Sequence, residues 1–94
     1  MTPASKLRKD IYKILKNRYL VFNLIEVKPS GIPDLMVIDP ANGEHTYIEI
    51  KAEGDRLRPN QEYMIDKMRT AKCKVYVVKD IDRVKEIFGL NSKD

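Results

Sequence analysis

The spacing of apolar side chains predicts a helix near the start of the chain, over residues 4–19. Within it, apolar residues recur three and four positions apart, as on one side of a helix; they are Leu7, Ile11, Ile14 and Leu15. Lysines recur at the same spacing on the opposite side, at Lys6, Lys9, Lys13 and Lys16. One side of this helix is therefore expected to pack against the protein, and the other to form a lysine stripe.

Three segments that follow have the composition of β-strands. Leu20–Val27 is rich in branched and aromatic residues. Asp34–Ile38 and His45–Lys51 flank residues 39–43, whose proline and glycine suit the positions of a tight turn. The second and third segments are therefore predicted to form a β-hairpin.

The second half of the chain predicts two more helices and one more strand. Pro59 is a favourable first-turn residue for a helix that runs to about Ala71. Lys74–Val78 is expected to be a short buried strand. Asp80 resembles an N-cap residue of a last helix, with Gly89 as its stop. The order α-β-β-β-α-β-α predicts an α/β or α+β sandwich with a four-stranded mixed sheet.

The predicted hairpin has a definite register. A four-residue loop at 40–43 pairs Asp39 with Glu44, and the same register places Asp34 opposite Glu49. Since alternate strand residues share a face, one face carries Leu35, Val37, Thr46, Ile48 and Ile50. The other carries Asp34, Met36, Ile38, His45, Tyr47, Glu49 and Lys51. The first set is nearly all apolar and is expected to face the core, which leaves two carboxylates and a lysine clustered on the opposite face.

Composition narrows the class of protein. The chain has 94 residues, of which 43% are hydrophobic and 34% charged, so one folded domain over residues 1–94 is expected. No apolar run is long enough to span a membrane. Cys73 and His45 are single, which excludes intrachain disulfides and clusters of Cys or His ligands. We expect a cytoplasmic protein, in a bacterium or a phage-infected host cell.

The positive charge is concentrated at the start of the chain. Residues 1–20 hold six basic residues and one acidic residue, Asp10, whereas residues 21–94 hold twelve basic and thirteen acidic. A basic stripe of this kind is either a solvated helix face or a surface that follows nucleic-acid phosphates. A helix lying on a membrane surface is a third reading, which the α/β pattern after residue 20 disfavours.

The paired carboxylates of the hairpin are the main candidate for chemistry. Directly opposite residues have Cβ atoms about 4.5–5.5 Å apart, so Asp34 and Glu49 repel each other unless one is protonated or a cation lies between them. Oxygen ligands of this kind suit Mg²⁺. Lys51, two residues further on, is expected to reach the same place, where an ammonium can orient water or counter phosphate charge.

These residues resemble a known nuclease signature. Gly31-Ile32-Pro33-Asp34, followed after the hairpin by Glu49-Ile50-Lys51, is similar to the PD-(D/E)xK motif. Residues 54–61, Gly-Asp-Arg-Leu-Arg-Pro-Asn-Gln, narrow the resemblance to the small stand-alone form of the VRR-NUC family. A second acidic-x-Lys triplet, Glu26-Val27-Lys28, does not follow a Pro-Asp and a hairpin, and we reject it as the motif.

The resemblance implies a fold, an activity and a set of roles. It implies a restriction-endonuclease-like αβββαβ core and an Mg²⁺- or Mn²⁺-dependent DNA endonuclease. Branched or junction DNA, such as a four-way junction, is the implied substrate, and a homodimer the implied assembly. Asp34, Glu49 and the Ile50 carbonyl are implied as metal ligands, Lys51 as the catalytic lysine, and Gln61 as the helix residue that completes the site.

This chain departs from the family pattern at two points. Relatives often carry an acidic residue on the first helix near the metal, where this chain offers only Asp10. Relatives often have Ser before the helix-starting Pro59, where this chain has Arg58. Gln61 is open to a second reading, as a helix-start residue that binds nearby backbone, and the two roles are compatible.

Several residues are predicted to contact DNA. They are the helix lysines Lys6, Lys9 and Lys13, the loop residues Lys28, Ser30 and Gly31, and the pair Arg56 and Arg58. For Ser30 and Gly31 a plain loop is an equal alternative. Tyr12 and Tyr19 could stack on bases, although packing beside the helix is the favoured reading.

A non-catalytic DNA-binding module on the same fold is the alternative function. A net charge of +4 and a one-sided basic helix suffice for nonspecific phosphate binding. The complete motif set favours the enzyme, and hydrolysis of a phosphodiester distinguishes the two.

Overall fold

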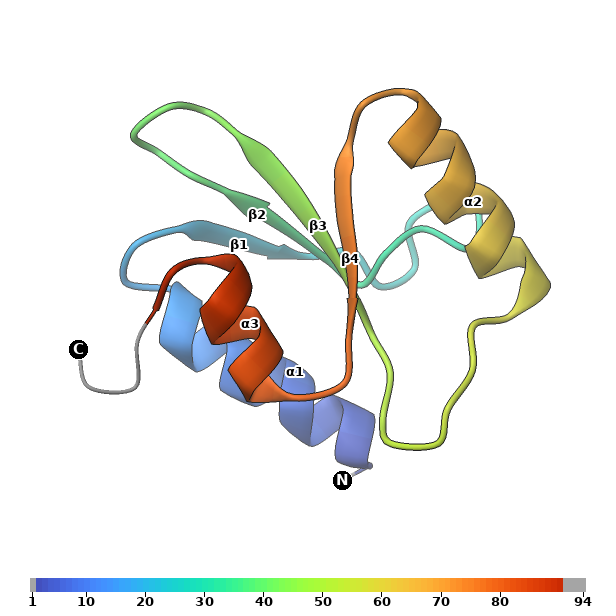
Figure 1. Ribbon diagram of the computed structural model, residues 1–94, viewed down its shortest axis with the longest axis horizontal. Coiled ribbons are helices and arrows are strands. Elements are labelled where there is room, and N and C mark those ends of the chain that lie inside the picture. The colour runs from blue at the N-terminus through green and yellow to red at the C-terminus, as the bar shows by residue number, and fades with distance from the viewer. Residues whose placement is uncertain (1, 91–94) are drawn as a thin grey trace.

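The structure is a computed structural model that describes residues 2–90. Its elements follow the predicted order (Figure 1): α1 (Pro3–Leu15), β1 (Leu20–Asn23), β2 (Leu35–Ile38), β3 (His45–Ile50), α2 (Pro59–Thr70), β4 (Lys74–Val78) and α3 (Ile81–Ile87). No helix within this range is long and apolar enough to cross a membrane.

The four strands form one mixed sheet in the order β1-β2-β3-β4. β1 pairs with β2, and β2 with β3, in antiparallel fashion, whereas β3 and β4 are parallel. Helix α2 makes the crossover that a parallel pair requires. The predicted four-stranded mixed sheet is therefore confirmed, and the fold is a small α+β fold.

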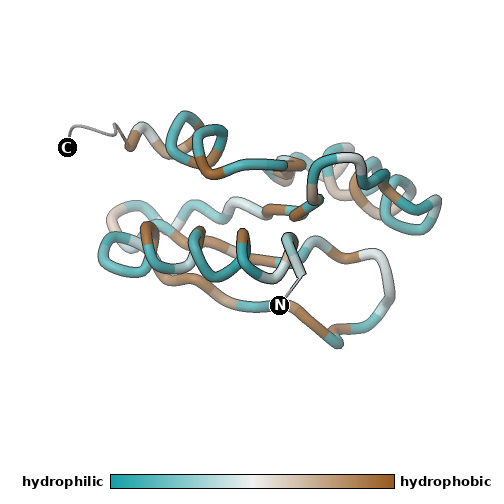
Figure 2. Tube along the Cα trace, turned by 90° about the horizontal axis from the view of Figure 1, so that it is seen from below, coloured by the Kyte–Doolittle hydropathy of each residue, from teal (hydrophilic) through white to brown (hydrophobic). Residues whose placement is uncertain are grey.

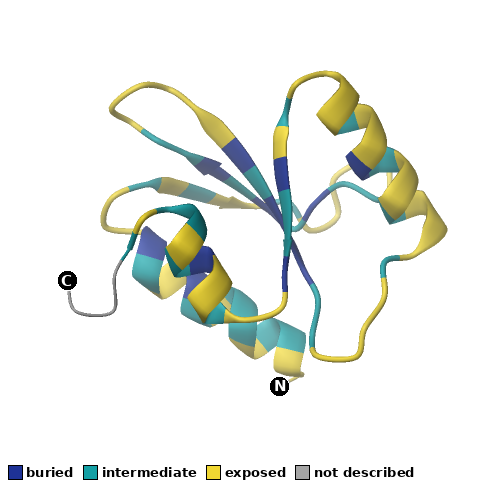
Figure 3. Ribbon diagram, in the orientation of Figure 1, coloured by how far each residue is buried: buried dark blue, intermediate teal, exposed yellow. Residues whose placement is uncertain are grey.

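The core lies between the sheet and the helices α1 and α3. It comprises Ile11, Leu15, Leu35, Val37, Ile48, Ile50, Val78 and Val84, each at most 4% exposed. The buried positions gather on the central strands and on the sides of the helices that face them (Figure 3). Hydrophobic and hydrophilic residues alternate along α1 (Figure 2), so this helix packs on one side, as its periodicity predicts.

The opposite side of the sheet is covered only in part. Helix α2 buries Ile65 against this side, where Val75 of β4 is also buried. Helix α2 packs mainly on β4. At the other edge, Leu20 and Phe22 of β1 are 51% and 44% exposed. An apolar strip of the sheet therefore faces outward beside the edge strand.

Two predicted elements are four residues longer than the observed ones at their C-terminal ends, whereas the others agree to within one residue. The predicted helix 4–19 ends at Leu15, because the chain turns there and brings Tyr19 against Phe88, with ring centroids 5.1 Å apart. The predicted strand 20–27 ends at Asn23, because its partner β2 begins only at residue 35. Beyond that point Glu26 has a left-handed backbone with φ 68°, which a strand does not accommodate.

The loop before β2 is packed tightly against the start of α2. Gly31 has φ +93°, and a Cβ atom on it would lie 2.5 Å from the backbone oxygen of Asn60. The side-chain amide of Asn60 also donates to the hydroxyl of Ser30, at 3.4 Å. Glycine is therefore required at position 31 both by the backbone angle and by the approach of α2.

We expect Gly31→Ala to lower the free energy of unfolding by about 3 kcal/mol or more, because it adds a backbone clash to the left-handed strain. The matched control is Gly54→Ala, since Gly54 has φ +87° but a Cβ atom on it would meet nothing within 4 Å. Strain alone predicts a loss of about 1–2 kcal/mol there. Denaturant unfolding of both variants measures the difference, and equal losses would contradict the packing argument.

Candidate active site

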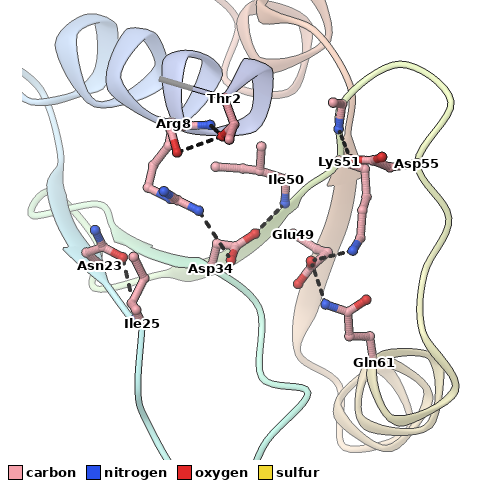
Figure 4. Close-up of polar contacts among 12 residues, drawn as sticks. Thr2, Arg8, Asn23, Ile25, Asp34, Glu49, Ile50, Lys51, Asp55 and Gln61 are labelled. Atoms are coloured by element: carbon pink, nitrogen blue, oxygen red, sulfur yellow. Dashed lines mark hydrogen bonds and ion pairs between the residues drawn. The ribbon is translucent and has the colours of Figure 1, made fainter.

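The register of the hairpin brings two carboxylates to one end of the sheet. The pairs Leu35↔Ile48 and Ile38↔His45 are those predicted from the turn. One step beyond the first pair, Oδ2 of Asp34 accepts a hydrogen bond from the backbone N–H of Ile50, at 2.8 Å. Asp34 is thereby anchored beside Glu49, and the predicted cluster is present (Figure 4).

Glu49 is the most buried charged group of this cluster. It is 2% exposed, and its Oε2 lies 3.2 Å from Nε2 of Gln61 and 3.7 Å from Nζ of Lys51. Its other oxygen, Oε1, is buried and has no hydrogen-bond partner among the described residues. Burial first, and then repulsion by Asp34, raise the pKa of Glu49 to about 7, whereas the ammonium of Lys51 acts in the opposite direction.

Gln61 connects the site to the start of α2. Its Oε1 accepts the backbone N–H of Arg58 at 2.8 Å, while its Nε2 donates to Glu49. The side chain therefore supplies one half of a capping box, since it accepts the backbone N–H of the N-cap residue Arg58, and it also holds the carboxylate of Glu49. Gln61 thus makes the helix-start contact and a contact to Glu49 at once, and α2 begins at Pro59 as predicted.

Lys51 is held at the site by its backbone and by its surroundings. Its N–H donates to the carbonyl of Val78 on β4, at 2.9 Å. Its side chain is 13% exposed and points back toward Glu49 (Figure 4). An ammonium in this position supplies positive charge next to the carboxyl group of Glu49.

Arg8 is a member of the site that the sequence analysis did not select. From α1, its Nη2 lies 3.9 Å from Oδ1 of Asp34, and its Nε is buried without a hydrogen-bond partner among the described residues. Asp10, by contrast, pairs with Lys6 at 3.1 Å. Helical spacing indicates only that Arg8, next to the apolar Leu7, borders the packed side of the helix; it does not indicate the contact with Asp34.

A groove leads to this cluster from the loop before β2. It has a volume of about 390 Å³, and its lining includes Arg8, Asp34, Lys28, Ser30 and Gly31. Lys28, Ser30 and Gly31, which are predicted to contact DNA, therefore line the same groove as Asp34 and Arg8. A nucleic-acid strand in this groove would meet the positive charges of Arg8 and Lys28, beside the carboxylates of Glu26 and Asp34.

Comparison with known proteins places the chain in a family. The sequence model of the VRR-NUC domain matches residues 25–80, which is more than half of the chain. The chain belongs to the VRR-NUC family. No match is found among curated proteins. The predicted resemblance is confirmed, and with it a nuclease-type domain whose general activity is that of a DNA endonuclease.

Two solved structures share the whole fold. One, named "VRR_NUC domain", has a TM-score of 0.83 and 26% sequence identity, over 95% of this chain and 97% of that one. Another, named "VRR_NUC domain protein", has a TM-score of 0.71 and 17% identity, over 99% of this chain and 90% of that one. The second likeness concerns the fold alone.

The remaining predicted contacts of this VRR-NUC chain lie elsewhere. Lys9 and Lys13 line a second groove, between α1 and the sheet, whereas Lys6 is exposed and paired with Asp10. Arg56 and Arg58 are exposed in the loop that follows Lys51. DNA contact by all of these residues stays a prediction.

The donor set fits a hard cation. Asp34 and Glu49 offer carboxylate oxygens side by side, and the partnerless Oε1 of Glu49 is a buried acceptor that a cation would satisfy. Residues 2–90 contain no group of three or more Asp, Glu, His or Cys that could hold a metal ion. Any ion here would therefore need backbone oxygen or water as further ligands.

The raised pKa of Glu49 predicts how stability depends on pH without metal. The folded state retains a proton on Glu49 up to about pH 7, whereas the unfolded state loses it near 4.5. The free energy of unfolding should therefore fall by about 3 kcal/mol as the pH rises from about 4.5 to 8. Denaturant unfolding in EDTA across this range measures the effect.

The control for this prediction is Glu49→Gln, which keeps the shape but does not ionise. Its stability should change less over the same pH range. Mn²⁺ at pH 8 should raise the melting temperature of the wild-type protein, because it stabilises the two carboxylates in the folded state. Equal pH dependence in both proteins, or no shift with Mn²⁺, would count against the site.

Proposed function

We propose that this VRR-NUC chain is a metal-dependent DNA endonuclease that hydrolyses phosphodiester bonds. The observation that carries the proposal is the cluster itself: two adjacent carboxylates, one with an unsatisfied buried oxygen, and a largely buried lysine beside them. Buried acidic groups with so little compensation cost stability. Such a cost is typical of a site retained for chemistry.

The carboxylates of Asp34 and Glu49, with the Ile50 carbonyl, would hold Mg²⁺ or Mn²⁺. When bound, such a cation activates water and offsets negative charge on the phosphate. Gln61 keeps Glu49 in place through its amide. The N–H of Ile50 does the same for Asp34. Preorganised ligands of this kind reduce the ordering that binding must otherwise supply.

Two cations of the chain are placed to act on the phosphate. Lys51 positions the attacking water or stabilises the pentacovalent phosphorus, since its ammonium lies next to Glu49. Arg8 approaches Asp34 from the opposite side, with Nη2 3.9 Å from Oδ1 of Asp34. Its fork suits the non-bridging oxygens of a phosphate, to which Arg binds in a bidentate manner.

Branched DNA, such as a four-way junction, is the substrate that the family resemblance suggests for replication, recombination or repair. One site cuts one strand at a time, so cutting both strands of a junction favours a symmetric dimer. The exposed apolar strip beside β1 supports a homodimer, because two copies could bury Leu20 and Phe22 against each other. We place this activity in one domain, residues 1–94, acting in the cytoplasm.

A non-catalytic DNA-binding module is the second candidate. The groove along α1 and the lysines on it would serve binding without turnover. The inward-facing lysine and the partnerless carboxylate oxygen have no use in such a module, and this favours the enzyme.

Cleavage of end-labelled DNA tests the proposal. The panel contains single strand, duplex, flaps and a four-way junction, each with Mg²⁺, Mn²⁺ or EDTA. Cleavage should require the metal, and Lys51→Ala should reduce its rate by about 100-fold or more. Asp34→Asn should have a similar effect, since a neutral amide binds the cation less well.

The control is Lys74→Ala, which removes an exposed lysine paired with Glu44 at the far end of β4. It should leave the cleavage rate unchanged. Full metal-dependent cleavage by Asp34→Asn would refute the assigned site. Binding without cleavage of any substrate would favour the module.

The proposed dimer has its own test. Light scattering should give the mass of two chains for the wild-type protein, and of one chain for Phe22→Glu, because a carboxylate in an apolar interface is strongly unfavourable. Tyr63→Glu is the control, since Tyr63 is 61% exposed but lies on α2. A wild-type monomer at micromolar concentration would remove the dimer from the proposal.

A further inference from the structure

A second groove runs between α1 and the edge of the sheet. It has a volume of about 400 Å³. Its floor includes Val21 and Leu35, which lie on the side of the sheet that α1 covers. Its wall is a single face of α1 that carries Tyr12 together with Lys9, Lys13 and Lys16. The groove is therefore apolar at its base and positively charged along its rim.

Tyr12 has no structural role that accounts for it. It is 48% exposed and does not belong to the cluster of side chains packed around the core. In the described part of the chain, three other tyrosines make ring contacts: Tyr19 with Phe88, Tyr63 with Lys67 and Tyr76 with Arg83. Of the two rings considered for stacking on bases, Tyr19 is thus packed and Tyr12 is available.

The two grooves meet at Arg8. This residue lines both of them and lies 3.9 Å from Asp34. At the same point, Asn23 lines the α1 groove, and the next residue, Leu24, donates its N–H to the backbone oxygen of Asp34 at 2.7 Å. A chain that lies along α1 is therefore led past Arg8 to the carboxylates.

The chemistry of this groove suits an unpaired nucleotide better than a duplex. Binding to the outside of a duplex requires cations at the spacing of the phosphates. It does not require an apolar groove floor or a free aromatic ring. An unpaired strand offers both a phosphate and the flat face of a base. Proteins that bind single strands combine a basic groove with exposed aromatic rings in this way.

We propose that the α1 groove binds the unpaired DNA that adjoins the scissile phosphate. The ring of Tyr12 stacks on a base of this strand over the apolar floor of the groove. Lys9, Lys13 and Lys16 contact the phosphates of the same strand. This inference rests on the proposed function and adds to it a substrate class. The preferred substrate contains a joint between duplex and single strand, with the unpaired segment along α1.

Binding to tailed and blunt DNA in EDTA tests this proposal separately from catalysis. The probes are a short blunt duplex and the same duplex with an unpaired tail at its 5′ or 3′ end. The tail carries 2-aminopurine, whose fluorescence reports stacking and can be excited cleanly because the chain contains no Trp. Tyr12→Ala should weaken binding to one tailed duplex by about tenfold and abolish the stacking signal. The affinity of Tyr12→Ala for the blunt duplex should stay within about twofold of the wild-type value, since the phosphate contacts are retained.

Two further variants control the experiment. Tyr12→Phe should retain both affinity and signal, because it keeps the ring. Tyr63→Ala removes a more exposed tyrosine on α2 and should have no effect. Thermal melting of each variant confirms that it is folded.

The possible results test binding in the α1 groove independently of the proposed nuclease activity. Tyr12-dependent binding of a tail, in a protein that cuts nothing, would uphold the groove and refute the proposed nuclease. Cleavage with equal binding of tailed DNA by wild type and Tyr12→Ala would overturn the groove alone. Loss of blunt-duplex binding to the same extent would also overturn it, since the groove would then hold a duplex.

Discussion

The adjacency of Asp34 and Glu49 is the constraint on which the site depends. A single register of the β2–β3 hairpin satisfies it, and the same register turns Val37 and Ile48 into the core. A slip by one residue would bury the carboxylates on the apolar side and expose the core residues. Hydrophobic packing of one sheet face therefore holds two like charges together on the other.

The side chains that contact these carboxyl groups come from three places in the chain. Arg8 comes from α1, Lys51 from the end of β3 and Gln61 from the first turn of α2. Lys51 is held by a backbone hydrogen bond to Val78 of β4, and Gln61 by its hydrogen bond to the backbone of Arg58. The site is thus a product of the whole fold, although its carboxylates belong to one hairpin.

Local patterns in the sequence were sufficient for most of the fold and for the centre of the site. Turn chemistry fixed the register, and the register fixed the partners of Asp34 and Glu49. Helix and strand ends were less predictable, because β1 stops where β2 no longer accompanies it. Arg8 was missed because its role arises from how α1 is docked on the sheet, and spacing along one helix does not encode that.

The side-chain amide of Gln61 is bound at both of its ends. Its oxygen is committed to the backbone at the start of α2, so its nitrogen must face Glu49. Folding of the first turn of α2 and alignment of the carboxylate are therefore one event. A local opening of that turn would release Glu49 from Gln61 while the sheet and core remain intact. In evolution, position 61 is then not free to vary with the site alone, because any replacement must serve a helix start and a carboxylate together.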